Sequence, residues 1–208
     1  PNRDTTIAFH NSVNRGKRSI LLDLKSDEGR DIFWRLLEDT DVVVQNYRKD
    51  RIAALGLGYE EVRRRKPDII YASLNAYGHL GPWAARPGHE GFAQATAGMT
   101  RRLGGNGKPE SQPNPVNDYG TGLMGAYGVA LALLHRRSTG KGQHIDSALA
   151  YTAMTLQSPY MQMYQGKTWN EPKGIGAMGG GALDRAYEAS DGWVYIHAGL
   201  SDLNQLSN

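Results

Sequence analysis

The stretch Asp41-Val-Val-Val-Gln45 is a short run of mostly β-branched residues, which favour the extended backbone of a strand. We expect this strand to be buried on both faces. Apolar runs at residues 19–24 and 69–74 predict two further strands. The segments between and after these runs predict helices at residues 26–38, with Ser26 as N-cap, and at 51–55 and 59–65. Strands that alternate with helices in this way indicate an α/β fold with a parallel, doubly wound sheet.

Polar residues follow the expected strands. Asn46-Tyr-Arg48 comes after the second apolar run, and Asn75-Ala-Tyr-Gly78 comes after the third. Ligands of parallel sheets collect at the carboxyl ends of the strands. Asn46 either caps the next helix or holds a ligand at this edge, and the residues themselves leave both interpretations open.

Two segments place titratable side chains beside glycines. Arg86-Pro-Gly-His-Glu-Gly-Phe-Ala-Gln94 carries His89 and Glu90, and Val116-Asn-Asp-Tyr-Gly-Thr-Gly122 carries Asp118. Each segment leads into a helix of small residues. These residue types can supply a nucleophile or an acid–base pair. The alternative for Asp118 is a structural N-cap of the helix that follows.

The helix after Asp118 is expected to run to about residue 137, and its first turns are crowded with glycines. Glycine costs about 1 kcal/mol relative to alanine in a helix, so these positions indicate close approach to another helix or to a ligand. A strand at residues 143–146 and a helix at residues 147–164 are expected next. Three methionines of this last segment are expected to pack in the core, namely Met154, Met161 and Met163.

The last part of the chain is rich in glycine. Residues 174–181 contain the triplet Gly179-Gly180-Gly181 and form either a linker or a lid whose backbone approaches a reacting carbonyl group. Residues 185–196 predict a β-hairpin that turns at Asp191-Gly192.

The composition excludes several classes of function. The 208 residues carry a net charge of +3 and no cysteine, which excludes disulfides and thiolate catalysis, and a reducing cytoplasm is the simplest expectation. We find no signal peptide and no apolar run that could span a membrane. The basic residues form scattered clusters, so we expect no nucleic-acid partner, although a small polyanionic ligand such as a nucleotide phosphate fits them. No residues have metal-ligand spacing, so we expect no metal.

Several motifs then occur in a characteristic order. They are Asn14-Arg-Gly-Lys-Arg-Ser-Ile20, Asp41-Val-Val-Val-Gln-Asn-Tyr-Arg48, Arg86-Pro-Gly88, Asp118 and Thr139-Gly-Lys-Gly-Gln143. Together they resemble the family III CoA-transferases, which include formyl-CoA transferases, carnitine CoA-transferases and α-methylacyl-CoA racemases. The resemblance implies a Rossmann-like parallel-sheet domain and a smaller domain, in two interlocked ring-shaped subunits.

The resemblance also implies a domain division. Residues 1–137 would belong to the large CoA-binding domain with the catalytic helix, and residues 138–208 would form a linker helix and the start of the small domain. Members of this family have further chain on both sides, so we expect this chain to be the middle of a homodimeric protein.

Candidate catalytic residues follow from the matching positions. Asp118 lies at the position of the family's catalytic aspartate. His89 lies where the racemases carry a catalytic histidine, and Glu90 lies where both branches carry an acidic residue. The triplet Gly179, Gly180 and Gly181 matches the mobile glycine loop over the active site of the transferases.

Candidate coenzyme A contacts follow in the same way. Leu22 matches a contact near the adenosine, and Asn46 and Tyr47 match a contact pair at a strand end. Ala54 stands where formyl-CoA transferases carry a CoA-binding arginine. We therefore expect Arg48 or Arg51 to substitute for that arginine.

The implied activity is transfer of coenzyme A from an acyl-CoA donor to a carboxylate acceptor through an anhydride and a thioester on Asp118. Coenzyme A would be a substrate, with no permanently bound cofactor. The alternative is racemase-like proton transfer at the α-carbon by His89 and Asp118. Ser201 stands where the racemases carry a supporting glutamate, and the triple glycine also favours the transferase. A second alternative is a non-catalytic remnant that binds coenzyme A.

Overall fold

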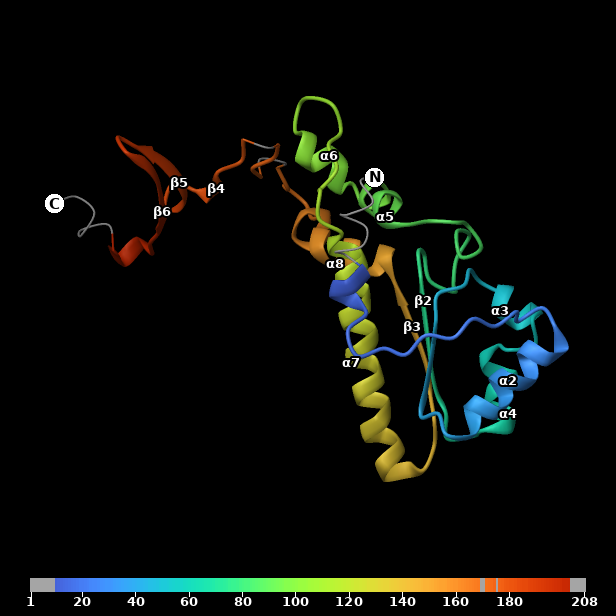
Figure 1. Cartoon of the computed structure of the whole chain (residues 1–208). Coiled ribbons are helices and arrows are strands. Elements are labelled where there is room, and N and C mark those ends of the chain that lie inside the picture. The colour runs from blue at the N-terminus through green and yellow to red at the C-terminus, as the bar shows by residue number, and fades with distance from the viewer. Residues whose placement is uncertain (1–9, 169–170, 175, 203–208) are drawn as a thin grey trace. The chain divides into compact units, whose positions relative to one another are not determined.

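A computed structural model describes residues 10–168, 171–174 and 176–202 (Figure 1). The chain divides into two compact units, Pro1–Thr40 and Asp41–Asn208. The domain boundary near residue 137 stays a prediction. Within the described ranges, no helix has both the length and the apolar character needed to cross a bilayer.

The first unit contains helix α2, Asp27–Glu38. Ser26 caps this helix as expected, because its hydroxyl oxygen accepts a hydrogen bond from the Gly29 N–H at 3.0 Å. The strand expected at residues 19–24 is wrong, since this segment pairs with no strand in the described ranges and Leu21 is 98% exposed. Asp23 instead accepts hydrogen bonds from the Lys25 N–H and the Ser26 hydroxyl. Turn formation ahead of α2 therefore prevails over the apolar pattern.

The second unit is built on a parallel sheet, which confirms the α/β fold class. Its strands are β1 (Val42–Gln45), β2 (Ile70–Asn75) and β3 (His144–Ala148), in the order β1-β2-β3. β2 is central and its first four residues are buried. β1 is an edge strand, and Val44 on it is 62% exposed. The expectation that β1 is buried on both faces is therefore wrong.

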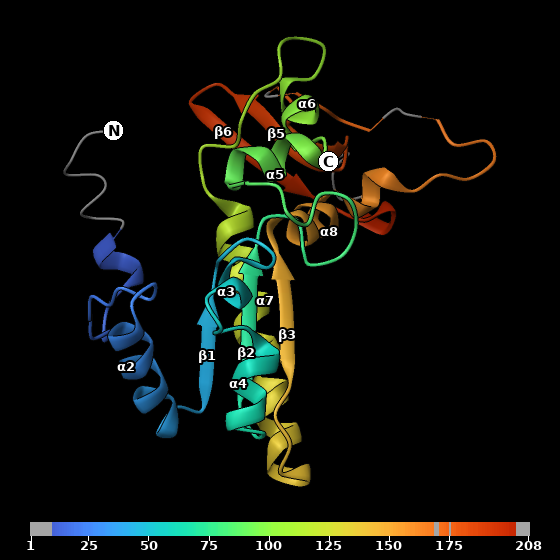
Figure 2. The ribbon, with the colours of Figure 1, turned by 90° about the vertical axis from the view of Figure 1, so that its right-hand side faces the viewer.

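Helices cover both faces of this sheet. The short helices α3 (Arg51–Ala54) and α4 (Tyr59–Arg65) lie on one face, and α7 (Val116–Thr139) lies on the other (Figures 1 and 2). The core around the sheet consists of fully buried side chains, among them Leu57, Val62, Ile69, Ile70 and Tyr71. Apolar burial of this kind is the main stabilising contribution to such a sheet.

The glycines of α7 allow the close contacts that the sequence predicts. A Cβ on Gly128 would lie 2.9 Å from Ile145 Cγ2 in β3, and one on Gly120 would lie 2.4 Å from Thr152 Cγ2. Thr152 belongs to α8 (Leu149–Met161), which packs against α7. Both the sheet and α8 therefore approach the backbone of α7.

Two further helices meet α8 beyond the carboxyl ends of the strands. α5 (Glu90–Thr96) and α6 (Met99–Gly104) follow a long loop after β2, and α5 packs on α8 through Ala93, Leu149 and Ala153. The methionines expected in the core are not there: Met154, Met161 and Met163 are exposed, the last to 83%. Small residues of α8 form the buried face in their place.

The C-terminal part forms a small antiparallel sheet. Its strands are β4 (Gly179–Gly181), β5 (Asp184–Ala189) and β6 (Gly192–His197), followed by the 3-10 turn η1 (Leu200–Asp202). The hairpin is confirmed, but Ala189 pairs with Gly192, so the turn lies at Ser190-Asp191, one residue earlier than expected. The triple glycine, expected in a loop, forms the edge strand β4.

Candidate active site

Glu90 joins the starts of two helices. It is the first residue of α5, and its carboxylate accepts hydrogen bonds from three donors at 2.8 Å each. These donors are the Asn117 side-chain amide, the Asp118 backbone N–H and the Gln94 side-chain amide. Hydrogen bonds to a charged acceptor are stronger than neutral ones, so Glu90 fixes the first turn of α7 against α5.

Asp118 lies in that first turn. Pro115 holds the N-cap position of α7 and Asp118 is the third helical residue, so the interpretation of Asp118 as the N-cap is wrong. Its carboxylate accepts no hydrogen bond from the described residues, while the positive end of the α7 helix dipole favours a negative charge in this turn.

The pKa of Asp118 is raised above its ordinary value. Partial burial of the carboxyl is the main cause, and the neighbouring charge of Glu90 adds to it, whereas His89 lowers the pKa. The carboxylate of Asp118 is therefore less well solvated and more basic than that of an ordinary aspartate. These are the properties that a carboxylate nucleophile or a general base needs.

Asp118 opens into a cavity of about 350 Å³ at the carboxyl ends of β1 and β2. Of the predicted site residues, this cavity brings together Asn46, Arg48, His89 and Asp118. Asn46 does not cap the next helix, because Asp50 holds the N-cap position of α3. The remaining walls come from the end of β2, the loop that follows it, α7 and α8, namely Leu74, Asn75, Ala76, Ala84, Arg86, Gly88, Thr121 and Leu149.

Other predicted site residues lie elsewhere. Tyr47 is 41% exposed and does not line this cavity, although its N–H donates to the Gln45 side chain at 2.7 Å. Arg51 is the first residue of α3 and is exposed. Leu22 belongs to the first unit, Pro1–Thr40. Gly179 and Gly180 line a different cavity, and Gly181 follows them in β4.

Two residues of the site were not singled out from the sequence. Arg86 lines the cavity, and its guanidinium lies 4.8 Å from the centre of the Trp83 ring. In the sequence, the feature that points to Arg86 is its position two residues before Gly88, at the end of a Gly/Pro loop. Asn117 is fully buried beside Asp118, and its side-chain oxygen has no hydrogen-bond partner in the described part of the chain. The residues next to Asn117 in the sequence do not indicate that it is buried.

The loop between β2 and α5 is tied to the sheet by polar contacts. The Asp146 carboxylate in β3 accepts a hydrogen bond from the His79 N–H at 2.9 Å and lies 2.8 Å from His79 Nδ1. The Asn75 side-chain oxygen accepts from the Gly78 N–H, and its amide donates to Asp146 at 3.1 Å. These contacts fix the start of the loop that carries Arg86 into the cavity.

The described side chains around this cavity do not form a metal site. Across the described ranges, no three His, Cys, Asp or Glu side chains are close enough together to hold a metal ion. The titratable groups near the cavity are the pair Asp118 and His89, with Glu90 beneath them. The arrangement can hold an anionic ligand with arginines and present one basic carboxylate to it.

Comparison with known proteins identifies the family of the chain. The model of the family described as CoA-transferase family III matches residues 1–205. A succinate–glutarate CoA-transferase from Agrobacterium fabrum is 39% identical over 146 residues, covering 68% of this chain and 36% of the relative. The human α-methylacyl-CoA racemase is 34% identical over 183 residues, covering 86% of this chain and 48% of the relative.

Solved structures show the same likeness. The crystal structure of a CaiB/BaiF family protein from Brucella suis has a TM-score of 0.79 and 34% identity, and it covers 96% of this chain and 53% of its own. The chain thus spans between about a third and a half of the length of these relatives. By its sequence, its parallel-sheet fold and its matched residues, the chain belongs to CoA-transferase family III.

Proposed function

We propose that the protein containing this chain transfers coenzyme A from an acyl-CoA thioester to a carboxylic acid, with Asp118 as the nucleophile. One observation carries the proposal. The Asp118 carboxylate faces a cavity lined by Arg48 and Arg86, is held in place by Glu90 through its backbone, and has a raised pKa. The relatives named as CoA-transferases support the same class of reaction.

The first half of the reaction moves coenzyme A onto the enzyme. An Asp118 oxygen attacks the thioester carbonyl carbon of the donor, the carbon–sulfur bond breaks, and the CoA thiolate leaves a mixed anhydride. The thiolate then attacks the Asp118 carbonyl carbon of that anhydride. The donor leaves as a carboxylate, and Asp118 becomes an aspartyl-CoA thioester.

The second half repeats these steps in reverse. The acceptor carboxylate attacks the aspartyl thioester and expels the thiolate, which gives a second anhydride. The thiolate attacks the acyl carbon of this anhydride, releases the new acyl-CoA and restores the Asp118 carboxylate. Every step exchanges one carbon–oxygen bond for one carbon–sulfur bond or the reverse, so no oxidant, water or metal takes part.

The other site residues have supporting roles in this proposal. Glu90 sets the direction of the first turn of α7, and the positive end of the α7 helix dipole stabilises negative charge at Asp118. Asn46, Arg48 and Arg86 hold the CoA moiety from the strand ends, and Tyr47 and Arg51 contact it further out. Gly179, Gly180 and Gly181 shield the anhydride from water.

A racemase-like activity is the second candidate, because His89 and Asp118 line the same cavity. One of them would remove the α-proton of an acyl-CoA and the other would return a proton to the opposite face. The similarity to the human α-methylacyl-CoA racemase supports this candidate. The transferase is preferred because Ser201 stands where the racemases carry a supporting glutamate, and because the triplet Gly179-Gly180-Gly181 favours a transferase.

The experiment that separates these activities is trapping. The whole protein is mixed with acyl-CoA and then treated with hydroxylamine, and the peptide carrying Asp118 is analysed by mass spectrometry. The proposal predicts a hydroxamate at Asp118, no such product for Asp118→Asn, and an unchanged product for the control Asp191→Asn in an exposed turn. An unmodified Asp118 together with exchange of the α-proton into deuterated water would establish the racemase. Binding of coenzyme A with neither chemistry would leave only the non-catalytic remnant.

A further inference from the structure

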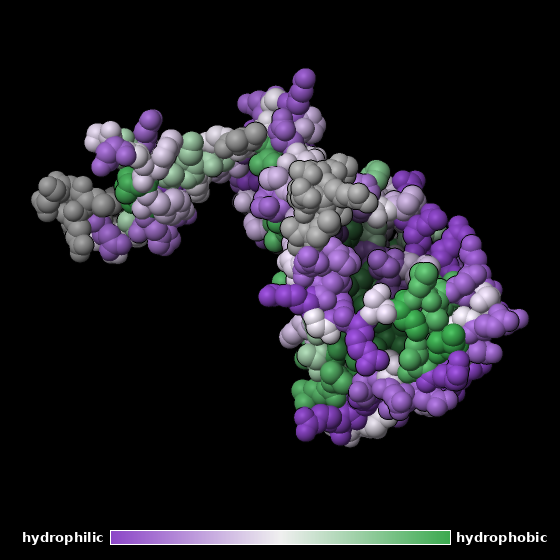
Figure 3. Space-filling model, in the orientation of Figure 1, coloured by the Kyte–Doolittle hydropathy of each residue, from purple (hydrophilic) through white to green (hydrophobic). Residues whose placement is uncertain are grey.

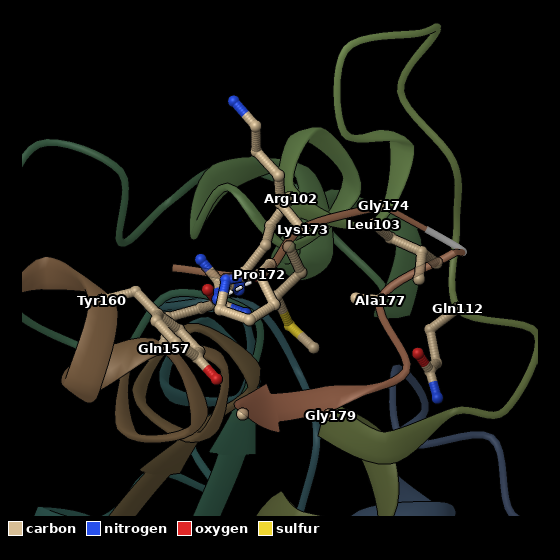
Figure 4. Close-up of a pocket in the computed structure, with 12 residues that line it drawn as sticks. Arg102, Leu103, Gln112, Gln157, Tyr160, Pro172, Lys173, Gly174, Ala177 and Gly179 are labelled. Carbon is tan, nitrogen blue, oxygen red and sulfur yellow. Dashed lines mark hydrogen bonds between the residues drawn. The ribbon is translucent and has the colours of Figure 1, made fainter. Parts of the chain in front are cut away.

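A second cavity of about 420 Å³ lies among α6, α8 and the segment that leads into β4. Figure 4 shows Gln157 and Tyr160 of α8 on one side of it and Gln112 on the opposite side. Gly179 and Gly180 of β4 also line it. It shares no lining residue with the cavity of Asp118.

Gln157 is a buried polar residue without a partner. Its exposed fraction is 9%, and its side-chain amide forms no hydrogen bond with any described residue. The amide atoms are not sealed inside the protein, since Gln157 lines the cavity. Because the amide opens on the cavity, it can donate a hydrogen bond to a ligand bound there or accept one from it.

Arg102 supplies a cation to the same cavity. Its guanidinium lies 3.2 Å from the centre of the Tyr160 ring and donates one hydrogen bond to the Pro172 carbonyl oxygen at 2.7 Å. No ion pair joins Arg102 to a carboxylate in the described part of the chain, and the neighbouring Glu171 is paired with Lys167. Four of the five N–H donors of the guanidinium are therefore left for a ligand.

The chemistry of the cavity fits a carboxylate. An arginine held by an aromatic ring binds carboxylates with directed hydrogen bonds, and an adjacent amide adds a further donor. Lys173 does not take part, because its side chain extends away from the cavity (Figure 4). Met99, Leu103 and Ala177 provide apolar surface for a short hydrocarbon chain.

A hydrogen-bonded chain connects this cavity with the anchor of Asp118. The Gln94 amide donates to Glu90 at 2.8 Å, and the Gln94 side-chain oxygen accepts from the Gln112 N–H at 2.8 Å. Gln112 lines the second cavity, while Glu90 accepts from the Asp118 N–H. Hydrogen bonds through Gln94 and Glu90 therefore link a residue of the second cavity to the backbone of Asp118.

We propose that the second cavity binds a short carboxylic acid, with Arg102 and Gln157 holding a carboxylate group of that acid. The inference rests on the proposed CoA transfer for the identity of the acid, which is the class of substrate that accepts or releases coenzyme A. The binding itself depends only on the residues of this cavity.

Calorimetry on the whole protein tests the binding, with glutarate as the probe and the neutral glutaramide as its matched control. Glutarate is expected to bind saturably and at least about tenfold more tightly than glutaramide. The reason is that glutaramide has no carboxylate to form a charged hydrogen bond with Arg102. Arg102→Gln and Gln157→Leu are each expected to weaken glutarate binding by about tenfold or more. The same changes at the exposed neighbours, Arg101→Gln and Gln162→Leu, should leave it unchanged.

The outcomes separate this proposal from the proposed function. Gln157→Leu guards against a folding artefact, because it leaves the contact of Arg102 with Pro172 in place. Asp118→Asn should still bind glutarate, since Asp118 lies in the other cavity. Equal binding of glutaramide, no saturable binding, or normal binding by both Arg102→Gln and Gln157→Leu would overturn the site. Glutarate binding without any CoA transfer would overturn the proposed function alone.

Discussion

Glu90 is the residue on which the position of Asp118 depends. Its two carboxylate oxygens accept three hydrogen bonds, and all three partners are donors. Glu90→Gln replaces one acceptor oxygen with a donor that faces another donor, which costs about 1–3 kcal/mol. We expect kcat to fall roughly tenfold to a hundredfold, as measured with saturating acyl-CoA. Glu110→Gln, at an exposed loop position, is the control, and an unchanged kcat for Glu90→Gln would show that Glu90 does not position Asp118.

The raised pKa of Asp118 predicts the pH dependence of activity. The nucleophile is the ionised carboxylate, so kcat/KM should fall as the pH drops through this raised pKa, at a higher pH than for an ordinary aspartate. Glu90→Gln removes the neighbouring negative charge, which is one cause of the shift. The acidic limb of the pH profile should therefore move to lower pH in this variant, and a limb that stays in place would refute the coupling between the two carboxyls.

The same shift makes a prediction about stability. The pKa of Asp118 is higher in the folded than in the unfolded chain, so the folded state binds this proton more tightly. Stability then falls as the pH rises from the ordinary aspartate pKa through the raised one. Asp118→Asn, which carries no charge, should raise Tm at neutral pH, and this gain should shrink toward acidic pH. A lower Tm at neutral pH would contradict the burial argument.

At the scale of elements, the glycines of α7 separate into two kinds. A Cβ at Gly122 meets no atom within 4 Å, whereas one at Gly128 lies 2.9 Å from Ile145. Gly122→Ala should therefore stabilise the protein by about 0.5–1 kcal/mol through helix propensity. Gly128→Ala should destabilise it by about 1–3 kcal/mol, because α7 must move away from β3. Urea unfolding measures both changes, and equal effects of the two substitutions would contradict the packing of α7 on the sheet.

Elements with a strong local signal were predictable from the sequence. The serine cap and acidic first turn of α2 and the β-branched run of β1 each agree with the structure. Residues 19–24 were misjudged because an apolar run forms a strand only when a partner strand is available. The exposed methionines of α8 show the same effect, since burial depends on which helix face meets α5 and α7 and not on residue type.

At the scale of the whole molecule, the sheet topology explains how much of the site was predictable. The carboxyl ends of β1 and β2 lie side by side in a parallel sheet, so Asn46, Arg48 and Asn75 meet in one cavity as the strand pattern predicts. The roles of Arg86 and Asn117 depend on how a loop and two helix starts pack together. Long-range packing of this kind has no short sequence pattern.

The surface of the second unit carries apolar side chains outside the core. Figure 3 shows hydrophobic residues at the surface beside the polar majority, and Leu123, Tyr127 and Leu134 of α7 are among the exposed ones. Tyr127 lies four residues after Leu123, and Leu134 lies seven residues after Tyr127. The three side chains therefore share one side of the helix, away from Gly128, which contacts β3. Apolar stripes of this kind are typical of surfaces that contact another element. The catalytic measurements proposed above accordingly use the whole protein.

Transfer of an oxygen atom from the acceptor acid to Asp118 would identify Asp118 as the nucleophile. In the proposed reaction, one oxygen of the acceptor acid forms the bridge of the second anhydride and stays on Asp118 when the new acyl-CoA leaves. The whole protein is given acyl-CoA and an acceptor labelled with heavy oxygen in unlabelled water, and the peptide carrying Asp118 is examined by mass spectrometry. We expect the label to enter the Asp118 carboxylate during turnover. Active turnover with an unlabelled Asp118 would contradict it.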